Sequence, residues 1–406
     1  MKNLGFLLLL LIVMNSCKDQ TVPSLSAGTW RGTMEVQDGQ LLPFNFSIGN
    51  GSEGYIMEIY NADEVLSIDE IIINNDSIII KMPVFEGYIS GRFTNSIIEG
   101  NFIKESLDRV VPFTANFNDS TRFVPSKAAA INVQGNWEAV FSKGTEDAYV
   151  AKGIFKQDGE KVTGTIRTTT GDYRYLEGVV DGDSLKLSTF DGTHVFLFLA
   201  RINDGIMNGT FYSGNHFQEP FEAVPNESYE LPDATTLTYL NEGYERVNFS
   251  FPDINGNLIT LDDHQFQDKV VIIQIMGTWC PNCLDESKFL VEYLKENSQD
   301  DLEVIALAFE YAKTEEAAFK GINRLKNRLG ISYPILLAQY GSSDKKTANE
   351  KLPMLNHILS YPTTIFIDKE SEVRRIHTGF NGPATGETYI EFKQDFKEFV
   401  NSLIAE

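Results

Sequence analysis

Short runs in which apolar and polar residues alternate dominate residues 28 to about 230. Runs such as 77–81 and 184–188 repeat with a period of two, and turns rich in glycine, asparagine and aspartate separate them. No stretch of this region keeps a helical period over eleven residues. Because the side chains of a strand point alternately to its two faces, this pattern predicts an all-β region of antiparallel strands.

The β-rich region also repeats its own sequence. Short motifs recur with nearly constant offsets of 107, 107, 109 and 108 positions: 28–30 in 135–137, 76–77 in 183–184, 100–102 in 209–211, and 112–113 in 220–221. A constant offset of this kind indicates an internal duplication. Each copy has about 90 residues, enough for roughly seven or eight strands in a sandwich or small barrel. We therefore expect β-rich units at residues 28–118 and 135–225.

Neither unit carries a cysteine, a nucleophile paired with a base, or a phosphate-binding loop. Gly-x-Trp at the first expected strand, with Trp30 and Trp137, bears a vague similarity to lipocalin-like barrels, but a tryptophan in an ordinary sheet core explains it more simply. The sequence leaves three roles open for the units. These roles are to present the C-terminal part of the chain, to bind a partner, or to hold an apolar ligand.

The pattern changes after a polar connector at residues 226–247. Residues 270–276 form an apolar run, broken only by Gln274, that is typical of a strand buried on both faces. The amphipathic stretch from Leu284 to about Asn297 predicts a helix. The remaining strands and helices are expected at residues 249–253, 258–261, 302–309, about 314–329, 333–338, 363–368, 373–378 and 389–404. This alternation predicts an α/β domain at residues 248–406.

The N-terminus has the features of a secretion signal. Lys2 is followed by an apolar run of eleven residues, Leu4 to Met14. Because a helix needs about 20 apolar residues to cross a bilayer, residues 1–16 are interpreted as a signal peptide. Ser16 directly before Cys17 resembles a bacterial lipoprotein signal, which implies cleavage before Cys17, a lipid on its thiol and a place in the bacterial cell envelope. Ordinary signal cleavage that leaves a free cysteine is the alternative.

The charge of the chain limits the classes of partner that it can bind. It has 57 acidic and 34 basic residues, for a formal net charge of -23. The acidic residues are spread along the sequence without a long block, as on a solubilising surface. Such acidity argues against nucleic acid as a partner and against electrostatic docking on anionic lipid.

The main chemical motif is Trp279-Cys280-Pro281-Asn282-Cys283, between the expected strand at 270–276 and the helix that follows. A CxxC at a strand-to-helix junction is typical of a dithiol/disulfide switch, because the helix N-terminus stabilises a thiolate on the first cysteine. A structural zinc site needs four ligands, and the only other cysteine is Cys17. We therefore expect redox chemistry and no metal.

The positions of the two cysteines suggest their roles. Cys280 is expected at the helix N-cap with Pro281 at the first helical position, where the missing N–H of proline costs nothing. Cys280 is then the nucleophile that forms a mixed disulfide with a substrate, and Cys283 resolves it. No flavin or nicotinamide fingerprint is visible, so we expect no cofactor and infer that an upstream thiol reductant regenerates the dithiol.

The C-terminal part resembles the TlpA/ResA-like branch of the thioredoxin superfamily, which are membrane-tethered disulfide oxidoreductases of the bacterial envelope. The matching segments are Phe249–Asp253, Asn255-Gly256, Gly277–Cys283, Glu286 and Tyr361–Asp368. The resemblance implies a thioredoxin-like fold in which Pro362 is cis and faces the CxxC. It also implies that Tyr361 pairs with a substrate strand, and that Trp279 and Pro281 support the site.

One acidic residue stands near the cysteines. Many thioredoxins have a buried aspartate where this chain has Gln274, which cannot take a proton, whereas Glu286 matches the acidic residue of the ResA-like branch. Three positions after Cys283, Glu286 lies on the same helical face and is placed to accept a proton when Cys283 attacks. The alternative is an ordinary solvated glutamate.

Taken together, these residues predict a membrane-anchored thiol-disulfide oxidoreductase that reduces disulfides of envelope proteins. A thiol peroxidase is one alternative, but its Pro-x-x-x-Thr-x-x-Cys pattern is absent, because Ile273 and Gly277 stand at the proline and threonine positions. The non-enzymatic alternative is a surface or periplasmic binding lipoprotein whose β-rich units carry the main role.

Overall fold

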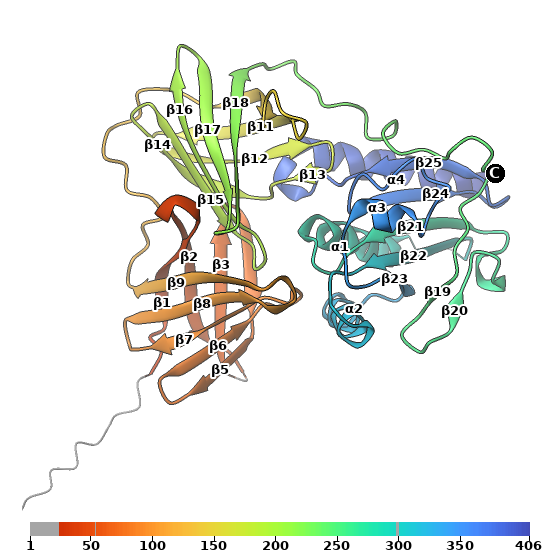
Figure 1. Cartoon of the computed structure of the whole chain (residues 1–406), viewed down its shortest axis with the longest axis horizontal. Helices are drawn as coiled ribbons and strands as arrows, with labels where there is room; N and C mark the ends of the chain where they lie inside the picture. Colours follow the sequence, from red (N-terminus) through yellow and green to blue (C-terminus); the bar gives the residue numbers. More distant parts are fainter. Residues whose placement is uncertain (1–23, 53, 298–299) are drawn as a thin grey trace, which may run out of the picture.

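The computed structural model of the chain describes residues 24–52, 54–297 and 300–406. The expected signal peptide and Cys17 lie outside these residues. Two β-rich units stand one above the other beside an α/β domain (Figure 1). We call them unit 1, unit 2 and the C-terminal domain. Across the described ranges, no helix combines the length and the apolar character needed to span a membrane.

Unit 1 is a nine-stranded antiparallel sheet in the order β4-β3-β2-β1-β9-β8-β7-β6-β5. Its strands are β1 Gly28–Glu35, β2 Leu41–Asn50, β3 Tyr55–Asn61, β4 Glu64–Ile68, β5 Glu70–Asn74, β6 Ser77–Lys81, β7 Tyr88–Phe93, β8 Ile97–Lys104 and β9 Arg109–Phe117. Pairing of β1 with β9 joins the two halves, and the strand order leaves the sheet open between β4 and β5. The expectation of seven or eight strands is therefore too low, because two of the strands at this opening have only five residues.

Unit 2 has the same strand succession, and its sheet closes. Its strands are β10 Gly135–Phe141, β11 Tyr149–Asp158, β12 Lys161–Thr168, β13 Gly171–Asp172, β14 Leu176–Asp181, β15 Ser184–Phe190, β16 Val195–Asn203, β17 Ile206–Ser213 and β18 Phe217–Pro225. The additional pairing of β11 with β12 completes a barrel, from which the two-residue β13 projects as an extension of β12. Most of its buried apolar residues form a cluster of their own, whereas Phe190, Val195, Leu197 and Tyr212 belong to the cluster that includes the core of unit 1.

The two units share details that support the duplication. Trp30 on β1 donates from Nε1 to the carbonyl oxygen of Ser26 over 3.0 Å, and Trp137 on β10 donates in the same way to Val133 over 2.8 Å. Both tryptophans are buried. Each therefore fastens the segment that enters the first strand of its unit, which identifies them as core residues.

The C-terminal domain is built on a five-stranded mixed sheet in the order β23-β22-β21-β24-β25. Its elements are β19 Phe251–Pro252, β20 Leu258–Ile259, β21 Val270–Met276, α1 Pro281–Glu296, β22 Leu302–Phe309, α2 Glu315–Leu329, β23 Ile335–Gln339, α3 Lys345–Asn349, β24 Thr363–Ile367, β25 Val373–Thr378 and α4 Glu387–Ala405. Single-turn 3-10 helices lie in this domain at His264–Phe266 and Pro383–Thr385, and in unit 1 at Gln37–Gly39 and Glu105–Leu107. Parallel β21, β22 and β23 with antiparallel β24 and β25 give the expected thioredoxin-like fold.

The central strand β21 explains where the chemistry lies. All seven of its residues are buried, because the sheet is covered on both faces. The strand ends at Met276, and α1 starts only five residues later, at Pro281. The CxxC motif therefore occupies the carboxyl end of the central strand, where α/β sheets carry their functional groups.

The connector at residues 226–247 lies against the C-terminal domain. Leu240 forms an isolated β-bridge with Leu355, and the amide of Thr378 on β25 donates to the carbonyl oxygen of Ala234 over 2.9 Å. Thr238 is buried and accepts a hydrogen bond from the Thr378 hydroxyl. The polar connector is thus docked on the domain that follows it.

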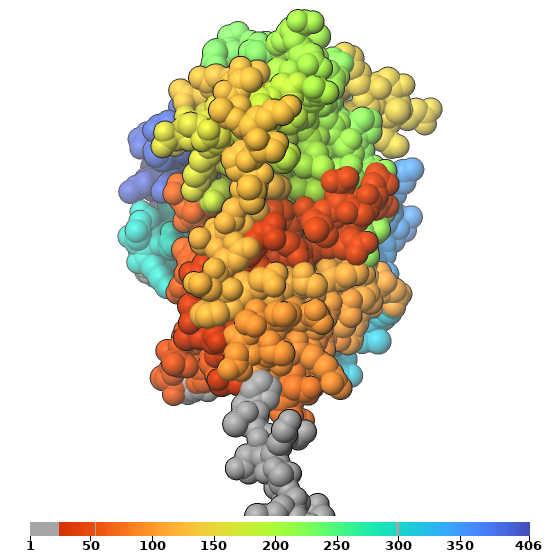
Figure 2. All heavy atoms as spheres, turned by 90° about the vertical axis from the view of Figure 1, so that its left-hand side faces the viewer, coloured from red at the N-terminus to blue at the C-terminus, as the bar shows by residue number. Residues whose placement is uncertain are grey.

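Figure 2 looks onto the two β-rich units from the side opposite the C-terminal domain. Unit 2 lies above unit 1, the segment between β9 and β10 runs across both, and the atoms of the C-terminal domain appear behind them. Strands β2 and β15 pack where the units meet. Both units therefore border the domain that carries the CxxC motif.

Candidate active site

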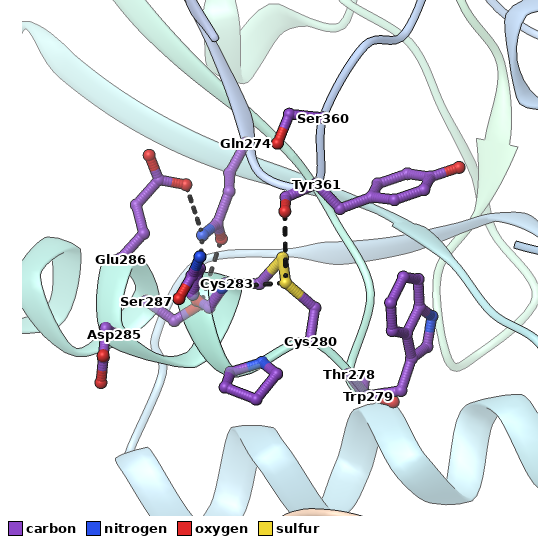
Figure 3. Close-up of a disulfide and its surroundings, with 12 residues drawn as sticks. Gln274, Thr278, Trp279, Cys280, Cys283, Asp285, Glu286, Ser287, Ser360 and Tyr361 are labelled. Carbon is purple, nitrogen blue, oxygen red and sulfur yellow. Dashed lines mark hydrogen bonds between the residues drawn. A yellow bond between two sulfur atoms is a disulfide. The ribbon is translucent and has the colours of Figure 1, made fainter. Parts of the chain in front are cut away.

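Cys280 and Cys283 form a disulfide at the start of α1, so the structure shows the oxidised state (Figure 3). Cys280 is the N-cap residue and Pro281 takes the first helical position. Cys280 is 5% exposed, whereas Cys283 is fully buried at 0%. Of the two cysteines, only Cys280 keeps any exposed surface.

The surroundings of the Cys280 sulfur suit both of its redox states. The backbone amide of Cys283 donates to Cys280 Sγ over 3.1 Å. This amide and the positive end of the α1 dipole favour negative charge on the sulfur once the disulfide opens. The carbonyl oxygen of Tyr361 lies 3.3 Å from the same sulfur, and the Tyr361-Pro362 bond is cis, as the resemblance implied. A protonated Cys280 thiol would thus find an acceptor, and its thiolate a donor.

Glu286 is buried in the domain, three residues after Cys283 on α1. It is 2% exposed, so the alternative of a solvated glutamate is wrong. Gln274 Nε2 donates to Glu286 Oε2 over 2.8 Å, and the Thr364 hydroxyl donates to Oε1 over 2.5 Å. Burial raises the pKa of Glu286 to about 7, although both hydrogen bonds act in the opposite direction. Its carboxyl group therefore exchanges a proton near neutral pH.

Gln274 connects this carboxyl group to Cys283. Its Nε2 also donates to the carbonyl oxygen of Cys283 over 3.4 Å, while its Oε1 accepts from the Ser287 hydroxyl over 3.2 Å (Figure 3). The amide is fully buried. Gln274 thus holds Glu286 against the helix turn that carries Cys283, in the place where many thioredoxins have an ionisable side chain.

A second buried carboxyl group, Glu310, lies on the Trp279 side of the disulfide. It accepts from the Thr278 amide over 2.8 Å and from the Thr278 hydroxyl over 2.7 Å. Burial raises the pKa of Glu310 to about 7. Trp279 donates from Nε1 to Phe309 over 2.9 Å, and its ring lies 5.6 Å from that of Tyr311. Sequence reasoning missed Glu310, although parallel β21 and β22 end side by side and bring it to this edge.

Unit 2 covers the other side of the disulfide with the loop at residues 168–175. Asn282 Nδ2, within the CxxC motif, donates to the carbonyl oxygen of Asp172 over 3.1 Å. The Ser360 hydroxyl, just before Tyr361, donates to Thr170 over 2.7 Å. A side chain at Gly171, where φ is +139°, would begin only 2.1 Å from Asn282 Nδ2. Only a glycine permits the loop to approach so closely.

Asp172 fixes a third loop of the domain. Its Oδ2 accepts from the amide of Gly382 over 2.6 Å, between β25 and α4. Burial raises the pKa of Asp172 to about 6. The 168–175 loop is therefore joined to the CxxC turn, to the segment before the cis-proline, and to the loop at Gly382.

Arg174 completes this contact in a buried ionic cluster. Its guanidinium group pairs with Asp285 on α1, with Glu64 of unit 1 and, over 3.5 Å from Nε, with Asp191 of unit 2. It also donates to the carbonyl oxygen of Pro281 over 3.2 Å. The acidic partners hold the pKa of Arg174 well above its usual value despite burial. The cluster ties both units to the helix that carries the cysteines.

Sequence reasoning assigned no chemistry to the units and missed this cluster. Arg174 and Asp285 are 111 residues apart, and neither has a local signal that marks it as buried. Over the described ranges, no group of three or more histidine, cysteine, aspartate or glutamate side chains is arranged to hold a metal ion. Near the disulfide, burial raises the pKa of three carboxyl groups, those of Glu286, Glu310 and Asp172.

Comparison with known proteins shows which families the chain resembles. A family model described as AhpC/TSA family matches residues 243–376. Thioredoxin-like protein YneN of Bacillus subtilis is 29% identical over 140 residues, which are 34% of this chain and 73% of that protein. Thiol-disulfide oxidoreductase ResA of Halalkalibacterium halodurans is 30% identical over 142 residues, 34% of this chain and 68% of that protein. ResA of Bacillus subtilis is 24% identical over 140 residues, 34% and 69% of the two chains.

Proposed function

The chain belongs to the ResA-like thiol-disulfide oxidoreductases, and we propose that it reduces disulfides of proteins in the bacterial envelope while a lipid on Cys17 holds it at a membrane. The observation that carries the chemistry is the unequal burial of the two sulfurs. Cys280 at the start of α1 keeps a small exposed area, whereas Cys283 is fully enclosed on the same helix as the buried carboxyl group of Glu286. This arrangement separates attack from resolution.

Reduction begins with the dithiol form. The Cys280 thiolate, stabilised by the Cys283 amide and the α1 dipole, attacks one sulfur of a substrate disulfide. A bond forms between Cys280 and that sulfur, and the substrate disulfide breaks. The other substrate sulfur leaves as a thiolate and takes a proton from water.

Resolution follows inside the domain. Cys283 gives its proton to the Glu286 carboxylate and attacks the Cys280 sulfur of the mixed disulfide. The second substrate sulfur leaves as a thiolate that takes a proton from water, and the Cys280–Cys283 disulfide of the structure forms. Two electrons have passed from the dithiol to the substrate. An upstream thiol reductant returns them by the reverse route.

Trapping of the mixed disulfide tests this order of attack. We expect Cys283→Ser to accumulate mixed disulfides with envelope proteins in cells, because the resolving thiol is gone. Cys280→Ser serves as the matched control and should trap nothing, because the buried Cys283 cannot meet a substrate. Non-reducing electrophoresis followed by mass spectrometry identifies the partners. Trapping by Cys280→Ser alone would reverse the assignment, and partners confined to the cytoplasm would refute an envelope substrate.

A thiol peroxidase is the second candidate, because the matching family model is described as AhpC/TSA. The residues before Cys280 argue against it. Ile273 lies in the buried core of β21, and Gly277 has no hydroxyl group with which to orient a peroxide. Consumption of hydrogen peroxide by the reduced protein, at a rate that matches its reduction of protein disulfides, would favour the peroxidase.

A further inference from the structure

A cavity of about 620 Å³ lies between unit 1 and the C-terminal domain, next to the residues that precede Cys280. Thr278 and Trp279 form part of its wall, together with Glu310–Lys313 and the first turns of α2. The opposite wall comes from unit 1, where the β6–β7 turn and Ser106 face the domain. Figure 3 shows Trp279 beside Cys280, so the cavity reaches the residue that directly precedes the first cysteine.

The two sides of the disulfide differ in access. On the Asn282 side, the 168–175 loop fills the space, with Thr170, Asp172 and Arg174 bonded to the domain. On the Trp279 side, unit 1 stands off and leaves the cavity. A substrate that approaches Cys280 while both units stay in place therefore arrives along the Trp279 side.

The charged side chains that line the cavity differ in whether they have a partner within the protein. The carboxylate groups accept hydrogen bonds from the protein itself: Glu86 from the amide of Ser106, Glu105 from Tyr88 and Glu310 from Thr278. Arg324 is held by Glu70 and by the carbonyl oxygen of Pro83.

Two lysines of the lining have no such partner. Lys81 and Lys320 are exposed, and neither has a side-chain hydrogen bond or an ion pair with any described residue. They lie on opposite walls, Lys81 at the end of β6 and Lys320 on α2. Lys81 and Lys320 therefore remain available to pair with acidic groups of a ligand, whereas Lys313 and Arg324 already pair with Asp108 and Glu70.

We propose that this cavity binds the acidic, extended peptide segment that flanks the disulfide of the substrate, an inference that rests on the proposed reductase function. A volume of this size is in the range that encloses a small ligand. It accommodates a short stretch of unfolded chain, whereas a folded domain is too large. The aromatic rings of Trp279 and Tyr311 offer apolar surface next to Cys280, while Lys81 and Lys320 pair with acidic side chains on the segment. Unit 1 thereby becomes part of the substrate site.

Two matched peptides test this assignment. Each is a disulfide-linked dimer of a short peptide with a central cysteine, flanked by glutamates in one version and by lysines in the other. The pre-reduced full-length protein reduces each peptide in a single turnover, and the second-order rate constant is compared in the wild type, Lys81→Glu, Lys320→Glu and the double variant. Lys397→Glu on α4, an exposed lysine outside the cavity, is the control.

We expect the double variant to lower the glutamate-to-lysine preference by about fivefold or more, as two surface charge pairs would, while Lys397→Glu keeps the wild-type preference. The ratio between variants cancels the intrinsic reactivity of each peptide. An unchanged preference in the double variant, with both peptides still reduced, would overturn the cavity assignment and leave the reductase intact. Failure of the wild type to reduce either peptide would instead refute the proposed function.

Discussion

Unit 2 and unit 1 derive from one duplicated sequence, yet their charged contacts with the C-terminal domain differ in burial. Unit 2 contributes Arg174, whose side chain is 5% exposed and which pairs with the buried Asp285. Unit 1 contributes Asp69 and Glu70, which pair with Arg328 of α2 at 32% exposure. Buried charges must be paired, whereas exposed pairs contribute little. Unit 2 thus supplies the arginine that pairs directly with the active-site helix. Among the ion pairs of the described residues, unit 1 reaches this helix only through Arg174, and it borders an open cavity.

The largest expected effect comes from removal of the buried arginine. Arg174→Met removes the one cation that Asp285, Glu64 and Asp191 share, although Lys288 and His194 remain beside Asp285 and Asp191. Loss of one partner of a buried ionic cluster typically costs about 3–5 kcal/mol, and we expect a loss of that size in the free energy of unfolding. Chemical denaturation followed by circular dichroism measures it.

Arg92→Met serves as the matched control for this variant. Arg92 pairs with Asp76 in unit 1, and its side chain is 79% exposed. The control should change the free energy of unfolding by less than about 1 kcal/mol. Equal losses in the two variants would mean that unit 2 does not hold the domain more firmly than surface contacts do.

Glu286 lies inside the C-terminal domain and touches neither unit. A variant at this position therefore tests proton transfer without changing the contacts with either unit. Below its pKa of about 7, Glu286 is protonated and can give its proton to the Cys283 thiolate that leaves when a thiol opens the disulfide. Above that pH it is ionised and cannot. We expect the wild type to be reduced by dithiothreitol about tenfold faster than Glu286→Gln at pH 6, with the ratio falling as the pH rises through 7.

Trp279 fluorescence follows this reaction. Because dithiothreitol ionises equally in both experiments, its ionisation cancels in the ratio of the wild-type rate to the Glu286→Gln rate. Glu292→Gln, at an exposed position of α1, is the control. The ratio of the wild-type rate to the rate of this variant should be near one at every pH. A ratio for Glu286→Gln that does not vary with pH would show that Glu286 does not transfer the proton.

The smallest effect is expected at the exposed contact of unit 1. Arg328→Gln removes the pairs with Asp69 and Glu70, which water can replace. We expect the free energy of unfolding to fall by about 1 kcal/mol or less. The same denaturation experiment measures it, and a loss as large as that of Arg174→Met would erase the distinction between the two units.

The C-terminal domain could be predicted from the sequence because its signals are local. The apolar run of β21 and the Cys280-Pro281 pair at the start of α1 each mark their own position. Helix α3 was missed because five residues are too few to show a helical period. The extra strands of the units escaped for the same reason, since β13 has only two residues.

The role of the units could not be predicted, because it depends on contacts between distant residues. Nothing near Arg174 in the sequence indicates that Asp285 will lie beside it. Gly171 shows why: its importance comes from a single side chain, Asn282, that reaches it from another domain. The burial of Glu286 was equally hidden, because the residues that enclose it come from β21 and β24.

The claim that the Cys280 sulfur is closed on one side and open on the other has a direct structural test. A crystal structure of the mixed disulfide between the Cys283→Ser variant and the glutamate-flanked peptide would show the path of the substrate. We predict that the peptide lies in the cavity between unit 1 and α2, between Lys81 and Lys320, with the Arg174–Asp285 pair intact. A peptide that lies across Asn282, with the 168–175 loop displaced, would contradict this account.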